Sequence, residues 1–198
     1  MYGTSLGGCL EPEISIVLAA AGVEFFFIDT EHSTTTYPQI QGLCRTARGA
    51  GLIPLVRVTQ NEPSLISRAL DVGAMGIIVP RVHSAAEARA AMDALKFPPL
   101  GHRGYGLGTI VTDLKGNSAQ EEVDSANRET MAVMMIESQE GVRAGMATHW
   151  RKESLPGQPW RNSWARWMDV PEAGVEPCIS MNPRWAFWDR MAWFLRVS

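Results

Sequence analysis

The stretch ALDVGAMGIIVPRV, residues 69–82, decides the fold. It closes a segment of helical composition, turns at Gly73, runs through a short apolar stretch and ends in the polar Arg81. A helix, a glycine turn, a buried strand and a polar residue in this order are typical of parallel α/β folds, in which residues after the strands share one face. The stretch therefore predicts one unit of such a fold.

The same alternation recurs from residue 3 to residue 137. The apolar runs expected to form strands are residues 3–6, 23–29, 53–58, 75–79 and 131–137, and the segments expected to form helices are residues 11–21, 37–50, 62–71, 84–95 and 118–129. The runs are apolar almost throughout, as in strands that are covered on both faces. This pattern predicts a parallel sheet with right-handed crossovers, as a barrel or a doubly wound sheet.

The segment FPPLGHRGYGLG, residues 97–108, is too rich in Pro and Gly for either element. It is expected to form a long loop between a strand and the next helix, over the mouth of an active site. Its glycines would let backbone N–H groups approach a ligand, so Gly104 is a predicted substrate-binding residue.

Composition restricts the possible classes of protein. The chain has 198 residues, enough for one domain but short of the about 250 of a complete (β/α)₈ barrel. A net charge of −3 supplies no basic field, so a nucleic-acid partner is not expected. Three widely spaced cysteines indicate neither a disulfide framework nor a zinc ribbon, and no stretch resembles a secretory signal or a membrane span. A cytoplasmic location without a membrane partner is predicted.

The composition changes near residue 143. All seven tryptophans lie between residues 150 and 198, and five prolines interrupt that region. Only residues 185–197 show helical spacing, which predicts a short amphipathic helix there. We interpret residues 1–142 as one partial barrel and residues 143–198 as a divergent tail. Two hypotheses for the tail remain open: it is non-native translated sequence, or it covers an open part of the barrel or recruits a partner.

Polar residues follow four of the predicted strands. They are Asp29, Glu31 and His32 after the second strand, Arg57 in the third, Arg81 and His83 after the fourth, and Glu137 after the fifth. Carboxylates, an imidazole and a guanidinium at one end of a barrel are suited to binding and deprotonating a metal-chelated keto acid. For Arg81 and His83 the better interpretation is a solvated loop.

Five motifs resemble the HpcH/HpaI aldolase family, the class II pyruvate aldolases. They are IDTEH at 28–32, PLVRV at 54–58, ALDVGAMGIIVPRV at 69–82, FPPLGHRGYG at 97–106 and MMIES at 134–138. The resemblance implies a TIM-type (β/α)₈ barrel, here incomplete, with about six of the eight strands. It also implies reversible cleavage of 4-hydroxy-2-oxo acids to pyruvate and an aldehyde, a small keto-acid substrate and a homo-oligomer.

The resemblance also implies roles for individual residues. His32 and Asp71 would move protons as catalytic residues, and Arg57 would bind the keto-acid oxygens and stabilise the enolate. Glu137 would be a ligand of a divalent metal, namely Mg²⁺, Mn²⁺ or Co²⁺. The family's second metal carboxylate, in a strand about two dozen residues further on, has no counterpart here, and Asp169 is not assigned to that role.

Two alternatives stay open beside the aldolase. One is a catalytically inactive truncated homologue or an interaction protein. The other is citrate-lyase-like or macrophomate-synthase-like chemistry on oxaloacetate.

Overall fold

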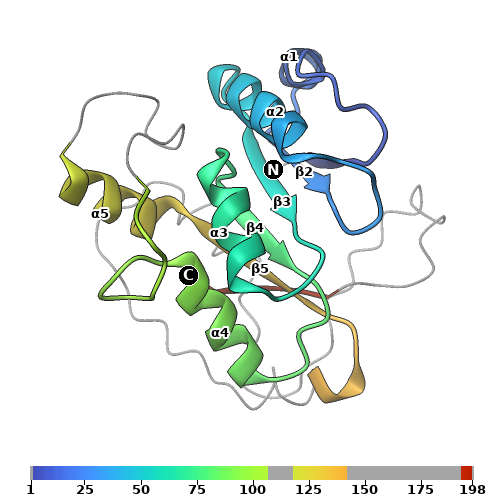
Figure 1. Cartoon of the computed structure of the whole chain (residues 1–198). Helices are drawn as coiled ribbons and strands as arrows, with labels where there is room; N and C mark the ends of the chain where they lie inside the picture. The colour runs from blue at the N-terminus through green and yellow to red at the C-terminus, as the bar shows by residue number, and fades with distance from the viewer. Residues whose placement is uncertain (1, 107–117, 142–192, 198) are drawn as a thin grey trace, which may run out of the picture. The chain divides into compact units, whose positions relative to one another are not determined.

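The structure is a computed structural model, and it describes residues 2–106, 118–141 and 193–197. Five parallel strands, paired in chain order, make up most of one sheet (Figure 1). They are β1 Gly3–Leu6, β2 Phe25–Asp29, β3 Ile53–Arg57, β4 Gly76–Val79 and β5 Met131–Ile136. Each lies within a predicted strand. Neighbouring parallel strands in chain order, with helices in the connections, are the arrangement found in part of a (β/α)₈ barrel.

Five helices lie in the connections, within the predicted segments. They are α1 Ile14–Ala20, α2 Tyr37–Gly49, α3 Pro63–Asp71, α4 Ala85–Leu95 and α5 Ala119–Glu129. Two begin with capping boxes, at Thr36 with Gln39 and at Ser118 with Glu121, and these bonds satisfy amides that have no partner within a helix. Helices α2, α3 and α4 pack beside strands β3, β4 and β5 (Figure 1).

Apolar side chains cover both faces of the sheet. Alternate residues of a strand point to opposite faces, so Val56 of β3 packs in the large core under the helices while Leu55 packs on the other face. Ile78 and Met135 join Leu55 there, and all three are buried. Two covered faces explain why the strands are apolar throughout rather than alternating.

The prediction of a helix at residues 185–197 was wrong where the structure describes that segment. Residues Trp193–Val197 form strand β6, which pairs antiparallel with β5. Aromatic and β-branched residues suit a strand, and pairing with β5 outweighed the helical spacing. About six strands of the barrel type were expected, whereas the described residues form five parallel strands and one antiparallel strand. Residues 185–192 lie outside the described part.

The prediction for the loop at residues 97–108 was also wrong in one respect. The loop follows helix α4 instead of a strand. The His102 amide donates to the Asp93 carbonyl at 2.7 Å, and the Arg103 amide donates to the Lys96 carbonyl at 2.9 Å. The described part, residues 97–106, therefore packs against the end of α4. A segment that follows a helix in this fold returns to the amino ends of the strands, away from the face that carries active sites.

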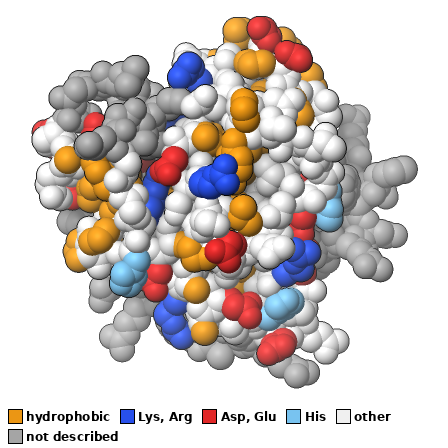
Figure 2. All heavy atoms as spheres, in the orientation of Figure 1, with side chains coloured by type: hydrophobic (Ala, Val, Ile, Leu, Met, Phe, Trp, Pro, Cys, Tyr) orange, Lys and Arg blue, Asp and Glu red, His pale blue; other side chains and the backbone are white. Residues whose placement is uncertain are grey.

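Two further sequence expectations concern cysteines and membranes. Cys9 and Cys44 are free thiols, and burial raises the pKa of Cys44 to about 12. Cys178 lies outside the described residues. Within the described ranges, no helix combines the length and the apolar character that crossing a membrane requires. On the face shown in Figure 2, acidic and basic side chains are interspersed.

Candidate active site

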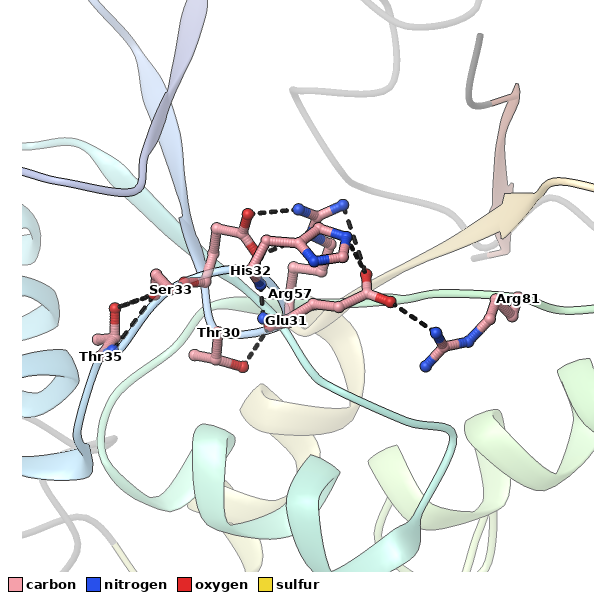
Figure 3. A network of polar contacts seen from close by, with 8 residues as sticks. Thr30, Glu31, His32, Ser33, Thr35, Arg57 and Arg81 are labelled. Atoms are coloured by element: carbon pink, nitrogen blue, oxygen red, sulfur yellow. Dashed lines mark hydrogen bonds and ion pairs between the residues drawn. The ribbon is translucent and has the colours of Figure 1, made fainter. Parts of the chain in front are cut away.

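The carboxyl ends of β2 to β5 bring together most of the predicted site residues. Asp29 ends β2, Arg57 ends β3, Arg81 follows β4 and Glu137 follows β5. The parallel register places Asp29 directly opposite Arg57. Figure 3 shows this region, with Glu31 between Arg57 and Arg81. The polar side chains that follow four strands therefore lie in one connected cluster.

Asp29 fixes the orientation of Arg57. The Arg57 Nε donates to Asp29 Oδ1 at 2.9 Å, and a terminal guanidinium nitrogen donates to Asp29 Oδ2. Such a fork-to-fork pair holds both groups in one plane. Burial raises the pKa of Asp29, but hydrogen bonds from Arg57 and from the amides of His32 and Glu31, together with the positive charge of Arg57, bring it below its ordinary value. Asp29 is therefore a permanent anion at neutral pH.

Glu31 joins two arginines. Its Oε2 lies 3.5 Å from Arg57 Nη1, and its Oε1 lies 3.1 Å from Arg81 Nη1. The side chains of Glu31 and Arg57 are 9% and 12% exposed, whereas that of Arg81 is 54% exposed. The cluster therefore runs from a partly buried cation, Arg57, through a partly buried anion, Glu31, to a cation that faces solvent, Arg81.

Arg81 also links this cluster to β5. Its backbone amide donates to Glu137 Oε2 at 3.0 Å, across 56 residues of sequence. Arg81 adopts φ +54°, a conformation uncommon for residues other than glycine, and this conformation accompanies the contact of its amide with Glu137. The sequence alone indicates a solvated loop residue at this position. The exposure of Arg81 agrees with that interpretation, but its contacts with Glu31 and Glu137 make it part of the cluster.

His32 lies at the rim of the cluster. Its amide donates to Asp29 Oδ1 at 3.2 Å, and its Nε2 lies 3.9 Å from Glu31 Oε2. The imidazole is 70% exposed, so it can exchange protons with a bound ligand or with water. Ser33 and Thr35 close the turn by donating to the Asp29 carbonyl.

His83 contacts the segment after β5. Its Nδ1 lies 2.8 Å from Ser138 Oγ, and its amide donates to Glu87 at 2.7 Å. The sequence interpretation of a solvated loop missed these contacts. Because Ser138 is next to Glu137, the pair helps to hold the segment that carries the predicted metal ligand.

Asp71 and Gly104 are not brought to this cluster within the chain. Asp71 is the last residue of α3, and its Oδ1 accepts a hydrogen bond of 2.7 Å from Arg103. Met75, four residues further on, donates to the Pro54 carbonyl near the start of β3. Asp71 thus lies toward the amino ends of the strands, together with Arg103 and the adjacent Gly104. The proton-transfer pair of His32 with Asp71 stays a prediction.

The donor set fits a divalent metal in part. Glu137 presents an exposed carboxylate, the hard oxygen ligand that Mg²⁺ and Mn²⁺ prefer. Glu31 contacts the same Arg81 whose amide donates to Glu137, and two arginines already engage the Glu31 carboxylate. Among residues 2–106, 118–141 and 193–197, no three His, Cys, Asp or Glu side chains gather as a metal site. The described residues offer one carboxylate, and substrate and water oxygens would have to complete the coordination.

A parallel α/β fold with charged side chains at the carboxyl ends of its strands is the design of barrel enzymes that act on small molecules. The sequence profile of one such family, described as HpcH/HpaI aldolase/citrate lyase, matches residues 10–146. The chain belongs to this family, as the five sequence motifs predicted.

Individual relatives agree with this assignment. A 4-hydroxy-4-methyl-2-oxoglutarate aldolase of Chaetomium globosum is 46% identical over 93 residues, which are 46% of this chain and 35% of that protein. The crystal structure of an HpcH/HpaI aldolase from Desulfitobacterium hafniense matches with a TM-score of 0.69 and 38% identity, over 72% of this chain and 54% of that one.

The citrate synthase SbnG matches with a TM-score of 0.63 and 34% identity, again over 72% of this chain and 54% of that one. The chain spans about a third to just over half of the length of these three relatives.

Proposed function

We propose that the protein is a metal-dependent aldolase of the pyruvate type, which reversibly cleaves 4-hydroxy-2-oxo acids to pyruvate and an aldehyde. Membership of the family and the names of its relatives support an aldolase-type lyase. One observation on this chain's own residues supports the proposal. Arg57 is held by Asp29 and Glu31 at the carboxyl ends of the strands, as an anion-binding group requires.

In this mechanism Arg57 binds the carboxylate and keto oxygens of the substrate. Because Asp29 fixes the plane of the Arg57 guanidinium, the side chain loses little conformational entropy when the keto acid binds. The same donors stabilise the negative charge of the enolate. His32, exposed at the rim, removes or returns the proton next to the keto group. Glu137 would hold the divalent cation, which supplies a Lewis acid for the keto oxygen when bound.

The test is exchange of the pyruvate methyl protons with solvent deuterium, followed by NMR in the presence of Mg²⁺, Mn²⁺ or Co²⁺. Exchange by the intact protein is expected to fall about 100-fold or more in Arg57→Lys, because a lysine cannot keep the paired contact with Asp29. In Glu137→Gln, addition of the metal should no longer increase the rate of exchange. Arg45→Lys, an exposed site on α2, is the matched control and should exchange like the wild type.

An absence of exchange with all three metals would refute the aldolase and leave the inactive homologue or interaction protein. A second candidate is carbon–carbon chemistry on oxaloacetate, which the likeness to a citrate synthase favours. Consumption of oxaloacetate without cleavage of any 4-hydroxy-2-oxo acid would support it.

A further inference from the structure

The segment that carries Glu137 is attached to the segment after β4 at three consecutive residues. The amides of Arg81 and Val82 donate to Glu137 Oε2 and to the Met135 carbonyl, each at 3.0 Å. These two attachments use backbone amides, which almost any residue supplies. The third attachment, at His83, depends on a side chain. The identity of residue 83 therefore matters for this junction in a way that the two residues before it do not.

His83 reaches the residue next to Glu137. Its Nδ1 lies 2.8 Å from Ser138 Oγ, and the Gly141 amide donates to the same oxygen at 3.1 Å. A hydroxyl has one proton and two lone pairs, so it can take part in both bonds. The Gly141 bond closes the turn at Ser138 without any histidine. The contact with His83 has another effect, because it joins the turn to the segment after β4.

His83 is itself fixed on its own side of the contact. Its amide donates to Glu87 Oε2 at 2.7 Å. Glu87 is held in turn, because its amide donates to Ser84 Oγ at 3.2 Å and its carbonyl accepts from Asn61 Nδ2 at 2.9 Å. His83 and Ser138 are both partly buried, so water competes less for the bond between them. The imidazole is therefore a fixed point to which Ser138 is tied.

Glu137, in contrast, is exposed, and its side chain would sample several rotamers without support. The attachments at Met135 and Ser138 fix the backbone on both sides of it, and the Arg81 amide engages one carboxylate oxygen. A fixed ligand binds a cation more tightly, because less conformational entropy is lost on binding. Groups that orient a metal ligand without touching the metal typically change the affinity for the metal by about 10- to 100-fold.

We propose that His83 is a positioning residue for the predicted metal ligand. Through Ser138 it holds Glu137 in place, and it thereby raises the affinity of the protein for a divalent cation. His83 touches neither the cation nor the substrate in this role. The inference rests on the proposed function, because it takes Glu137 as the metal ligand. The sequence alone assigned His83 to a solvated loop.

The test measures Mn²⁺ binding by the intact protein from the EPR signal of the free ion. Pyruvate is present throughout, because its oxygens would complete the coordination. His83→Leu should raise the Kd for Mn²⁺ about tenfold, the lower end of the range for groups that orient a ligand. His83→Asn should stay within about threefold of the wild type, since an amide group close to the position of Nδ1 can bond to Ser138.

A second pair of variants tests the same contact from the other side. Ser138→Ala should also raise the Kd about tenfold or more, because it removes the partner of His83. When residue 138 is already alanine, His83→Leu should change the Kd by less than about twofold, since both substitutions remove one shared bond. His102→Leu, the same substitution at an exposed histidine in the loop after α4, is the matched control and should bind Mn²⁺ like the wild type.

Three results would overturn the inference. One is a His83→Leu protein that binds Mn²⁺ like the wild type, even if urea unfolding shows that it is less stable, because His83 would then be structural only. Another is equal weakening in His83→Leu and His83→Asn, which would exclude the bond to Ser138 as the cause. The third is a full effect of His83→Leu in the Ser138→Ala protein, because the two residues would then act independently.

Failure of the proposed function has a different signature. If the wild type binds no Mn²⁺, or if Glu137→Gln binds it as tightly as the wild type, the metal-dependent aldolase fails and the inference fails with it. If Glu137→Gln abolishes binding and His83→Leu leaves it unchanged, Glu137 remains the metal ligand and only the role of His83 is overturned.

Discussion

At the scale of single residues, Asp29 holds the site together. Its carboxylate accepts from the Arg57 side chain and from the amides of Glu31 and His32, so one side chain orients the cation and shapes the turn that carries the imidazole. Its side chain is only 14% exposed. A partly buried charge with this many donors is stabilised by them and destabilises the fold when they are lost.

We expect Asp29→Asn to lower the free energy of unfolding at pH 7 by about 1–3 kcal/mol, because an amide would turn a donor toward Arg57. The pKa of Asp29 is lowered in the folded state, so its contribution is present above the unfolded value of 3.8 and is lost as the pH falls through the folded value. The difference between variant and wild type should therefore shrink below about pH 4.

Urea unfolding of both proteins at pH 7, 4 and 3 measures this difference. Asp93→Asn, an exposed site on α4, serves as the control and should change stability little at any of the three. A deficit of Asp29→Asn that stays constant down to pH 3 would contradict the linkage.

At the scale of elements, three strands approach one another closely where β4 enters the sheet. A Cβ on Gly76 would lie 2.8 Å from Leu55 Cδ2 and 2.8 Å from the Met131 carbonyl oxygen. Glycine at this position therefore lets β3, β4 and β5 approach one another. The backbone oxygen cannot move without disturbing the ladder between β4 and β5.

Gly76→Ala is expected to destabilise the protein by about 1–3 kcal/mol, because the added methyl group forces the strands apart. Gly49→Ala, at the end of α2, is the matched control, since nothing lies within 4 Å of the position that its added methyl group would take. It should be neutral or stabilising by up to about 1 kcal/mol. Chemical unfolding of both variants measures the contrast, and equal effects would show that the close approach at Gly76 carries no cost.

The sequence predicted elements better than it predicted contacts between them. All five parallel strands and all five helices fall within the predicted segments, because local composition and turn residues determine them. The position of the loop at 97–106 and the strand conformation of β6 were wrongly predicted. Contacts with parts of the chain outside each segment determine both. Lys96 shows the same limit: it donates to the Asn127 and Thr130 carbonyls, and burial lowers its pKa to about 8.

For the candidate site, too, the sequence predicted residues better than it predicted the contacts between them. Strand ends predicted His32, Arg57 and Glu137 at one face, which the structure brings near one another. The contact of Arg81 with Glu137 spans 56 residues and depends on a backbone conformation that no local pattern specifies. Pairing of Asp71 with Arg103 likewise required the folded chain.

At the scale of the whole molecule, the sheet has two ends of different kinds. Strand β1 pairs with β2 on one side, whereas β5, the last parallel strand described, pairs with β6 on its outer side. An unpaired edge strand would present open amides and carbonyls to other chains. The antiparallel pairing therefore covers the edge at which the next strand of a complete barrel would lie.

This arrangement predicts that β6 protects β5. Leu195 pairs with Met134 in the register, and Leu195→Pro would remove a donor and disturb the ladder. Hydrogen exchange of the amides in Met131–Ile136 is expected to accelerate by about tenfold or more, since opening of an edge needs less free energy once its partner is lost. Strand β1, at the other end of the sheet, supplies the internal control and should exchange as in the wild type. If Leu195→Pro leaves exchange in β5 unchanged, the pairing with β6 does not protect the sheet. The edge of β5 would then have to be regarded as open.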